Sequence, residues 1–243
     1  MLEAAFWGFV GGFALLVGAG IGVALPVPQR VLGAVMAFGA GVLISAVAFD
    51  LVEEGFQAAG WWPVTFGLAA GALVFHVGDM IVNRFGGHDR KRSTGSQAGG
   101  AATAIVLGAV LDGIPESAAV GVTLLGGGGV GIAVVVAVFL SNVPESLSAS
   151  VGLLRAGHSR RWILGLWLGV ALVSAAAAAA GYGLLGGAPP ATVAIVKAFA
   201  AGAILTMLAD TMMPEAFDDA GRFVGLLTSA GFGAAFLLSH LTD

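Results

Sequence analysis

Two copies of a short motif place carboxylates where charge is costly. Residues 111–125 read LDGIPESAAVGVTLL and residues 140–154 read LSNVPESLSASVGLL, so both hold a Pro-Glu-Ser triplet. Each copy lies inside an apolar run long enough to cross a bilayer, which predicts Glu116 and Glu145 near the middle of the membrane. A carboxylate there costs roughly 2.5 kcal/mol or more and is by default a candidate for a substrate or ion pathway.

Neighbouring residues on the same helix faces add further oxygen ligands. Asp112 precedes Glu116 by one helical turn, Ser141 precedes Glu145 in the same way, and Asn142 lies one step round. Neither segment contains Lys or Arg, so two such helices packed face to face would gather three carboxylates that only cations neutralise. The pattern predicts a metal site of Asp112, Glu116, Asn142, Glu145 and Ser141.

The motif serines do not favour a hydrolase. A serine nucleophile needs a base within hydrogen-bonding reach, and no histidine lies near either copy. The sequence therefore indicates a protein that is not an enzyme.

Composition places the motif in a membrane protein. Of the 243 residues 58% are hydrophobic and 10% are charged, against about 25% charged in soluble proteins. The mean hydropathy is +0.98, and the absence of cysteine excludes disulfides and thiolate metal sites. We expect an all-α polytopic protein without a prosthetic group or a nucleic-acid partner.

Eight apolar runs are long enough to span a bilayer, and their connections are too short for a second domain. Residues 1–243 are therefore predicted to form a single transmembrane domain. The predicted spans are residues 4–25, 31–52, 62–82, 99–125, 130–154, 162–185, 191–213 and 222–241.

The basic residues predict the orientation of the chain in the cell membrane. If eight spans alternate, nine of the ten Lys and Arg residues fall on one side, and Lys197 is the exception. The positive-inside rule makes that side cytoplasmic and puts the N and C termini outside. The nine are Arg30, Arg84, Arg90, Lys91, Arg92, Arg155, Arg160, Arg161 and Arg222.

A second repeat relates spans two and seven. Residues 37–56, AFGAGVLISAVAFDLVEEGF, align with residues 198–217, AFAAGAILTMLADTMMPEAF, and these two spans are predicted to run in opposite directions. Related segments of opposite direction indicate an inverted repeat, a design that places the substrate site near the midplane.

LDGIPES and SNVPES resemble the HNxPEG and HExPHE signatures of the ZIP (Zrt/Irt-like) family of divalent metal transporters. The resemblance covers essentially the whole chain. It implies eight transmembrane helices in a 3+2+3 inverted-repeat bundle, both termini extracytoplasmic, a basic or histidine-bearing loop between spans three and four, and a homodimer.

The resemblance also assigns positions in the transport site. Asp112 stands where the family has its first histidine, Gly113 replaces an asparagine, and Glu116 matches the family glutamate. In span five Ser141 and Asn142 stand at the positions of the family's first two polar ligands, and Glu145 keeps the third ligand of that motif. Ser174 stands where the family often carries a span-six glutamate. No transport-site histidine is present.

Other ionisable residues are candidate pathway residues. Asp50, Glu53 and Glu54 at the outer end of span two form either a cation-concentrating funnel or an ordinary wet helix end. His76 and Asp79 in span three, with Asp210 and Glu215 in span seven, form either an exit relay or an interfacial set. His88 and His158 are expected on the cytoplasmic surface.

The combined reading is a ZIP-like transporter that moves a divalent metal cation toward the cytoplasm. The cargo is expected among Zn, Mn, Fe, Co and Cd, and an all-oxygen ligand set suits the harder ions of this group. The alternative is a ZIP-shaped protein without transition-metal transport, either a metal sensor or a carrier of another cation.

Overall fold

The computed structural model describes residues 1–84, 101–126 and 129–242. Its regular elements in these ranges are all helical, and seven helical runs are long and apolar enough to cross a membrane. The chain is therefore an all-α, multi-pass membrane protein. In order, the elements are α1 Leu2–Ala24, α2 Gln29–Ala46, the π-helical η1 Val47–Glu53, α3 Glu54–Ala59, α4 Trp61–Arg84, α5 Ala101–Thr123, η3 Leu124–Gly126, α6 Ile132–Arg155, α7 Arg160–Leu185, α8 Pro190–Met207, the π-helical η4 Leu208–Met212, α9 Met213–Ala220, η5 Gly221–Phe223 and α10 Val224–Thr242.

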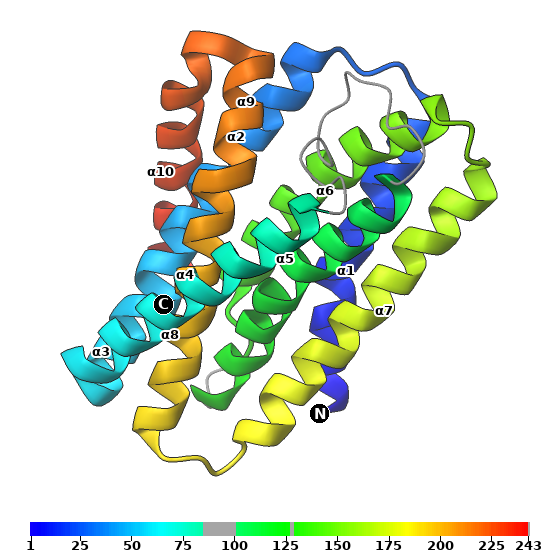
Figure 1. Cartoon of the computed structure of the whole chain (residues 1–243). Coiled ribbons are helices and arrows are strands. Elements are labelled where there is room, and N and C mark those ends of the chain that lie inside the picture. Colours follow the sequence, from blue (N-terminus) through cyan, green and yellow to red (C-terminus); the bar gives the residue numbers. More distant parts are fainter. Residues whose placement is uncertain (85–100, 127–128, 243) are drawn as a thin grey trace.

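Connections alternate between two ends of the bundle (Figure 1). The α1–α2, α6–α7 and α9–α10 connections lie at one end, which we call the basic end because they hold or adjoin five arginines. The N-terminus and the α3–α4 and α7–α8 connections lie at the opposite end, which we call the N-terminal end. The five arginines are Arg30, Arg155, Arg160, Arg161 and Arg222.

Two span boundaries differ from the prediction. The second helical run continues to Ala59, past the predicted end at residue 52, because the helix stops only at Gly60, which has a φ of 78°. The last run, Pro190–Ser239, is 50 residues long and includes the predicted span 191–213 and all but the last two residues of the predicted span 222–241. The chain reverses within this run at Gly221, which has a φ of 64° (Figure 1). His88 and three of the predicted basic residues lie outside the described ranges.

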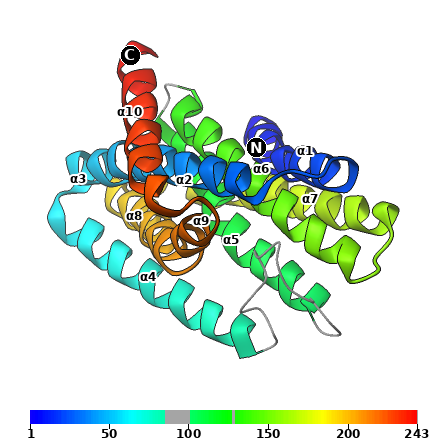
Figure 2. The same cartoon turned by 90° about the horizontal axis from the view of Figure 1, so that it is seen from above.

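The helices form two groups (Figure 2). In the first group α1 packs against α6 and α7, and α5 packs against α7. In the second group α4 packs against α8, and α2 packs against α10. Contacts of α2 with α6 and of α5 with α8 join the groups, so α5 and α6 bring the two Pro-Glu motifs to the boundary between them.

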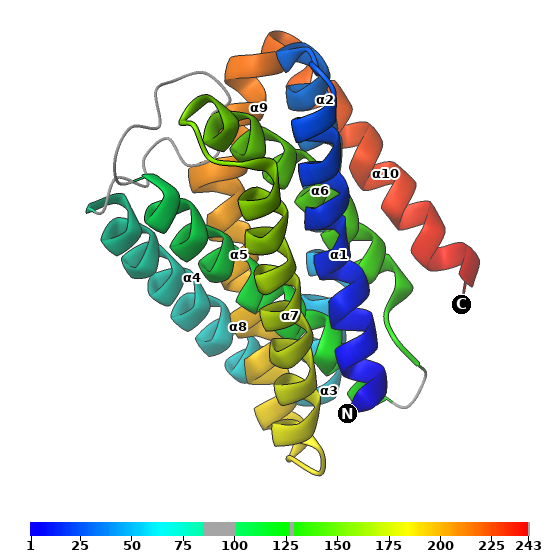
Figure 3. The same ribbon diagram turned by 90° about the vertical axis from the view of Figure 1, so that its right-hand side faces the viewer.

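Glycines explain how closely α1 packs against both α6 and α7, which lie next to it in Figure 3. One face of α1 places Gly8 and Gly12 against the α7 backbone, and another places Gly18 and Gly22 against α6. A Cβ at Gly22 would lie 2.7 Å from the carbonyl oxygen of Leu147, and one at Gly18 would overlap that of Val143. Small residues spaced by four let membrane helices approach closely, so one helix can serve both neighbours.

Element lengths repeat along the chain. The helices α2 and α8 each have 18 residues, each follows an N-cap proline, and each continues into a π-helical segment. The interval from Gln29 to Pro190, where these helices start, equals the interval between the turn glycines Gly60 and Gly221. The same interval separates residues 37–56 from residues 198–217 in the predicted repeat.

Candidate functional site

The motif helices continue without a break through their prolines. Pro115 lies inside α5 and Pro144 inside α6. Proline removes a backbone hydrogen bond, and neighbouring helices of a bundle can accommodate the carbonyl that is freed. The backbone around the carbonyl of Leu140 lies close to Gly39 of α2, where a Cβ would be 3.1 Å from its oxygen.

All the predicted metal-site side chains are buried. Asp112, Glu116 and Ser141 are at most 2% exposed, and Asn142 and Glu145 are at most 6% exposed. Hydropathy alone predicted this burial, since the motif lies inside long apolar runs. These side chains form a polar strip within a predominantly apolar interior.

Glu116 and Ser141 connect the two motif helices. The Ser141 hydroxyl donates to Glu116 Oε1 at 3.3 Å and also lies 3.0 Å from the carbonyl oxygen of Val138 in its own helix. A hydroxyl has one proton to donate, so the two acceptors compete for it. The contact places one oxygen ligand from each motif side by side.

Asn142 is directed toward α1. Its Nδ2 donates to the carbonyl oxygen of Gly11 at 3.2 Å, while the Ser146 hydroxyl donates to the backbone carbonyl oxygen of Asn142 at 2.8 Å. The side-chain amide thus joins two helices, and its nitrogen is not available to the Glu116 side of α6.

Within residues 1–84, 101–126 and 129–242, no group of three or more His, Cys, Asp or Glu side chains is arranged to hold a metal. The motif helices contact each other through Ser141 and Glu116, but α6 packs mainly against α1, and α5 packs mainly against α7. The convergence of the three carboxylates on one cation stays a prediction.

Ser174 of α7 lies beside the α5 motif. A Cβ on Gly113 would be 3.5 Å from Ser174 Oγ, and Ser174 is itself buried. Because α7 packs against α5, Ser174 supplies a hydroxyl next to the residue that follows Asp112.

No protein-family model matches this sequence, and no curated protein matches it. The functional argument therefore depends on the residues and their geometry.

The acids at the end of α2 separate into different environments. Glu54 in α3 accepts a hydrogen bond from Lys197 of α8 at 2.5 Å, whereas the exposed Glu53 accepts one from Gln57 at 2.7 Å. Asp50 lies in the π-helical η1 and is half-buried. The predicted funnel of acids therefore contains an ammonium group.

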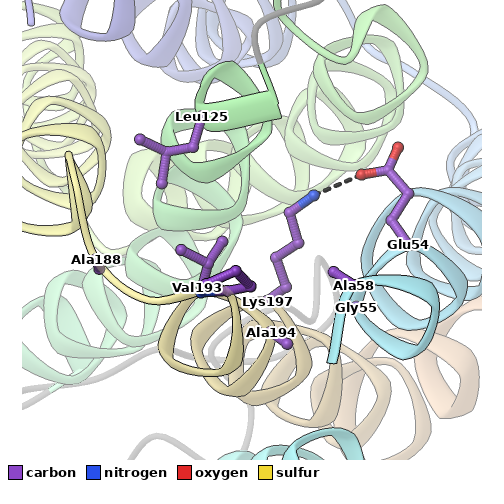
Figure 4. Close-up of a pocket in the computed structure, with 9 residues that line it drawn as sticks. Glu54, Gly55, Ala58, Leu125, Ala188, Val193, Ala194 and Lys197 are labelled. Carbon is purple, nitrogen blue, oxygen red and sulfur yellow. Dashed lines mark hydrogen bonds and ion pairs between the residues drawn. The ribbon is translucent and has the colours of Figure 1, made fainter. Parts of the chain in front are cut away.

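The Glu54 and Lys197 side chains line a cavity of about 340 Å³ at the N-terminal end (Figure 4). Its walls include Val193 of α8, Leu125 of η3, which follows α5, and Ala188 of the α7–α8 connection. The cavity thus lies where α3 and α8 of one helix group meet the end of α5 from the other.

The predicted exit residues are brought together only in part. His76 Nδ1 of α4 lies 3.4 Å from Asp210 Oδ2 of η4, and both side chains are substantially exposed. Asp79 instead accepts a hydrogen bond from Asn83 at 2.7 Å. Glu215 lies on α9, beyond the π-helical segment that holds Asp210. Of the four predicted exit residues, His76 and Asp210 are the pair whose contact the structure shows, and a relay through all four stays a prediction.

Lys197 is the residue whose role the sequence analysis missed. The signal was its isolation as the one basic residue in an otherwise apolar segment, away from the other nine. An ionisable residue within a membrane helix is a functional candidate by default. Its partner Glu54 lies on a distant segment of the chain, so local patterns could not predict the pair.

Proposed function

We propose that this protein is a transporter that moves a divalent metal cation across the membrane. The cation passes a midplane site at the boundary of the two helix groups, where Asp112 and Glu116 of α5 lie with Ser141 and Glu145 of α6. Ser174, the side-chain oxygen of Asn142 and the backbone carbonyls near the prolines are further candidate oxygen ligands.

The placement of acidic side chains in the interior is the observation that carries the proposal. Among the described residues, four acidic side chains are buried, namely Asp79, Asp112, Glu116 and Glu145. Three of them belong to the two Pro-Glu motifs, which α5 and α6 bring to the boundary between the helix groups. An acidic side chain within a membrane helix is costly and is by default a candidate for an ion pathway.

The proposed architecture is the ZIP-like 3+2+3 inverted repeat with eight spans. The equal lengths of α2 and α8, their π-helical extensions and the matching positions of the turn glycines support this arrangement. The basic end is proposed to be cytoplasmic, which puts both termini outside and makes cytoplasmic uptake the direction of transport. A homodimer is proposed from the resemblance alone.

Flux into proteoliposomes tests the transport proposal. We expect purified protein to admit at least one of Zn, Fe, Mn, Co and Cd faster than protein-free vesicles, and Glu116→Gln to remove that flux. Equal flux with and without protein for all of these ions would contradict the proposal.

A second candidate is a ZIP-shaped protein that senses metal or carries another cation. The absence of three convergent metal-ligating side chains in the described ranges favours it. A sensor would be protected by metal against thermal unfolding without any flux, while a carrier of another cation would show flux for Mg or Ca but not for the transition metals.

A further inference from the structure

The cavity at the N-terminal end contains a positive charge that is fixed to the protein. The Lys197 side chain is 8% exposed, and its ammonium donates to Glu54, whose side chain is 56% exposed. Figure 4 shows the lysine reaching across the cavity from α8 toward Glu54 on α3. The buried partner is the cation and the accessible partner is the anion.

This cavity lies at the end of α5 that follows the buried motif. Leu125, in its wall, belongs to η3 and is nine residues beyond Glu116 along the chain, a rise of roughly 13 Å. Lys197 lies seven residues inside the start of α8, roughly 10 Å below the helix end. A cation that enters from this end and follows α5 toward Glu116 would start at the cavity that holds the ammonium group.

We propose that Lys197 is a tethered cation that limits the access of divalent cations to the site. Glu54 is the anion, and Lys197 competes with the arriving cation for it. This inference rests on the proposed transport function. A fixed positive charge lowers the local concentration of free cations, and a doubly charged ion is repelled twice as strongly as a singly charged one. Lys197 thus determines the cation concentration at which the transporter half-saturates.

The aligned position in the other repeat suggests which residue could replace Lys197 without its charge. When the alignment of residues 37–56 with residues 198–217 is extended by one position, Met36 of α2 stands opposite Lys197. Met36 is 1% exposed, so an apolar unbranched side chain is accommodated at the equivalent depth. Lys197→Met is therefore expected to fold, and Lys197→Arg keeps the charge and serves as its matched control.

Thiol labelling measures the potential in the cavity without requiring transport. The chain has no cysteine, and the exposed Ala58 lines the cavity, so Ala58→Cys gives a single reactive site. The measured quantity is the ratio of reaction rates with cationic and anionic methanethiosulfonates. We expect Lys197→Met to raise this ratio roughly fivefold and Glu54→Gln to lower it, as follows from one unit charge about 8 Å away in water.

Flux measured on the same variants completes the test. At low ionic strength, Lys197→Met should lower the half-saturating cation concentration roughly fivefold and Glu54→Gln should raise it. The double variant and Lys197→Arg should stay near the wild type. Arg222→Met, which removes a positive charge at the basic end, should change neither quantity.

The outcomes separate the two proposals. An unchanged labelling ratio in Lys197→Met, or a shifted ratio with an unchanged half-saturating concentration, would overturn the role of Lys197 while leaving transport intact. A shifted ratio without cation flux in any variant, the wild type included, would contradict the proposed function and support the charge assignment in the cavity.

Discussion

Glu116 is the residue on which the proposed site depends most. It is 1% exposed, and it accepts the Ser141 hydroxyl across the helix boundary. Glu116→Gln keeps the shape and removes the charge, so we expect flux to fall at least tenfold while thermal stability in detergent is kept or raised, because a buried charge is costly to desolvate. Glu145→Gln is expected to behave in the same way.

Ser141→Ala is the comparison for this prediction, since it removes a neutral hydroxyl and its hydrogen bond but keeps the carboxylate. We expect it to lower flux less than Glu116→Gln does. Normal flux in Glu116→Gln at normal expression would show that this glutamate is structural.

Asp112 determines the metal preference in our proposal. The surrounding ligands are carboxylate, amide and hydroxyl oxygens, which suit harder ions, whereas Zn and Cd sites usually use imidazole or thiolate. Asp112→His should therefore raise the ratio of Zn flux to Mn flux, measured by competition in vesicles. An unchanged ratio, in protein whose flux is still abolished by Glu116→Gln, would mean that Asp112 does not touch the ion.

The burial of each site residue was predictable from the sequence, but the neighbouring helix toward which its side chain is directed was not. Asp112, Glu116 and Glu145 are buried because of the apolar runs around them, as predicted, and the pairing of His76 with Asp210 follows the predicted grouping. Asn142 is directed toward Gly11, because the rotation of α6 is determined by its packing against α1. One helix sequence does not specify which neighbour it will contact most closely.

At the scale of elements, α1 is constrained by close backbone contacts on two of its faces, one against α6 and one against α7. Gly18 touches the α6 backbone, whereas a Cβ on Gly20 of the same helix would meet nothing within 4 Å. Gly18→Ala should therefore overpack the α1–α6 contact and lower the melting temperature by roughly 5 °C. Gly20→Ala should leave it unchanged or slightly higher, because alanine favours helix. Equal melting temperatures in a detergent thermal-shift assay would show that α6 is able to move away from α1.

The helices themselves were more predictable than their irregularities. Hydropathy locates the spans to within a few residues, but it does not predict that α2 continues through a π-helical segment to Ala59. The extra residue of a π-helical turn changes hydrogen bonding and leaves composition unchanged. Local patterns therefore miss a feature that both α2 and α8 carry.

For the whole molecule, the orientation is testable with two single-cysteine variants. Ala58→Cys lies at the N-terminal end, and Ala156→Cys lies in the α6–α7 connection at the basic end; both positions are exposed. In intact cells an impermeant thiol reagent should modify the Ala58→Cys variant, and it should modify the Ala156→Cys variant only after the membrane is permeabilised. The reverse pattern would place the basic end outside and reverse the proposed direction of transport.

The paired π-helical segments also indicate the order of two evolutionary events, the gain of the extra residue and the duplication. A π-helical turn holds one residue more than the α-helical turn that it replaces, and η1 and η4 begin at equivalent places, directly after 18-residue helices. If the two outer three-span units descend from one duplicated gene, as the proposed repeat requires, the extra residue was gained before the duplication. The ancestor of these units was then a three-span chain, whose copies inserted into the membrane in both orientations and assembled as an antiparallel pair.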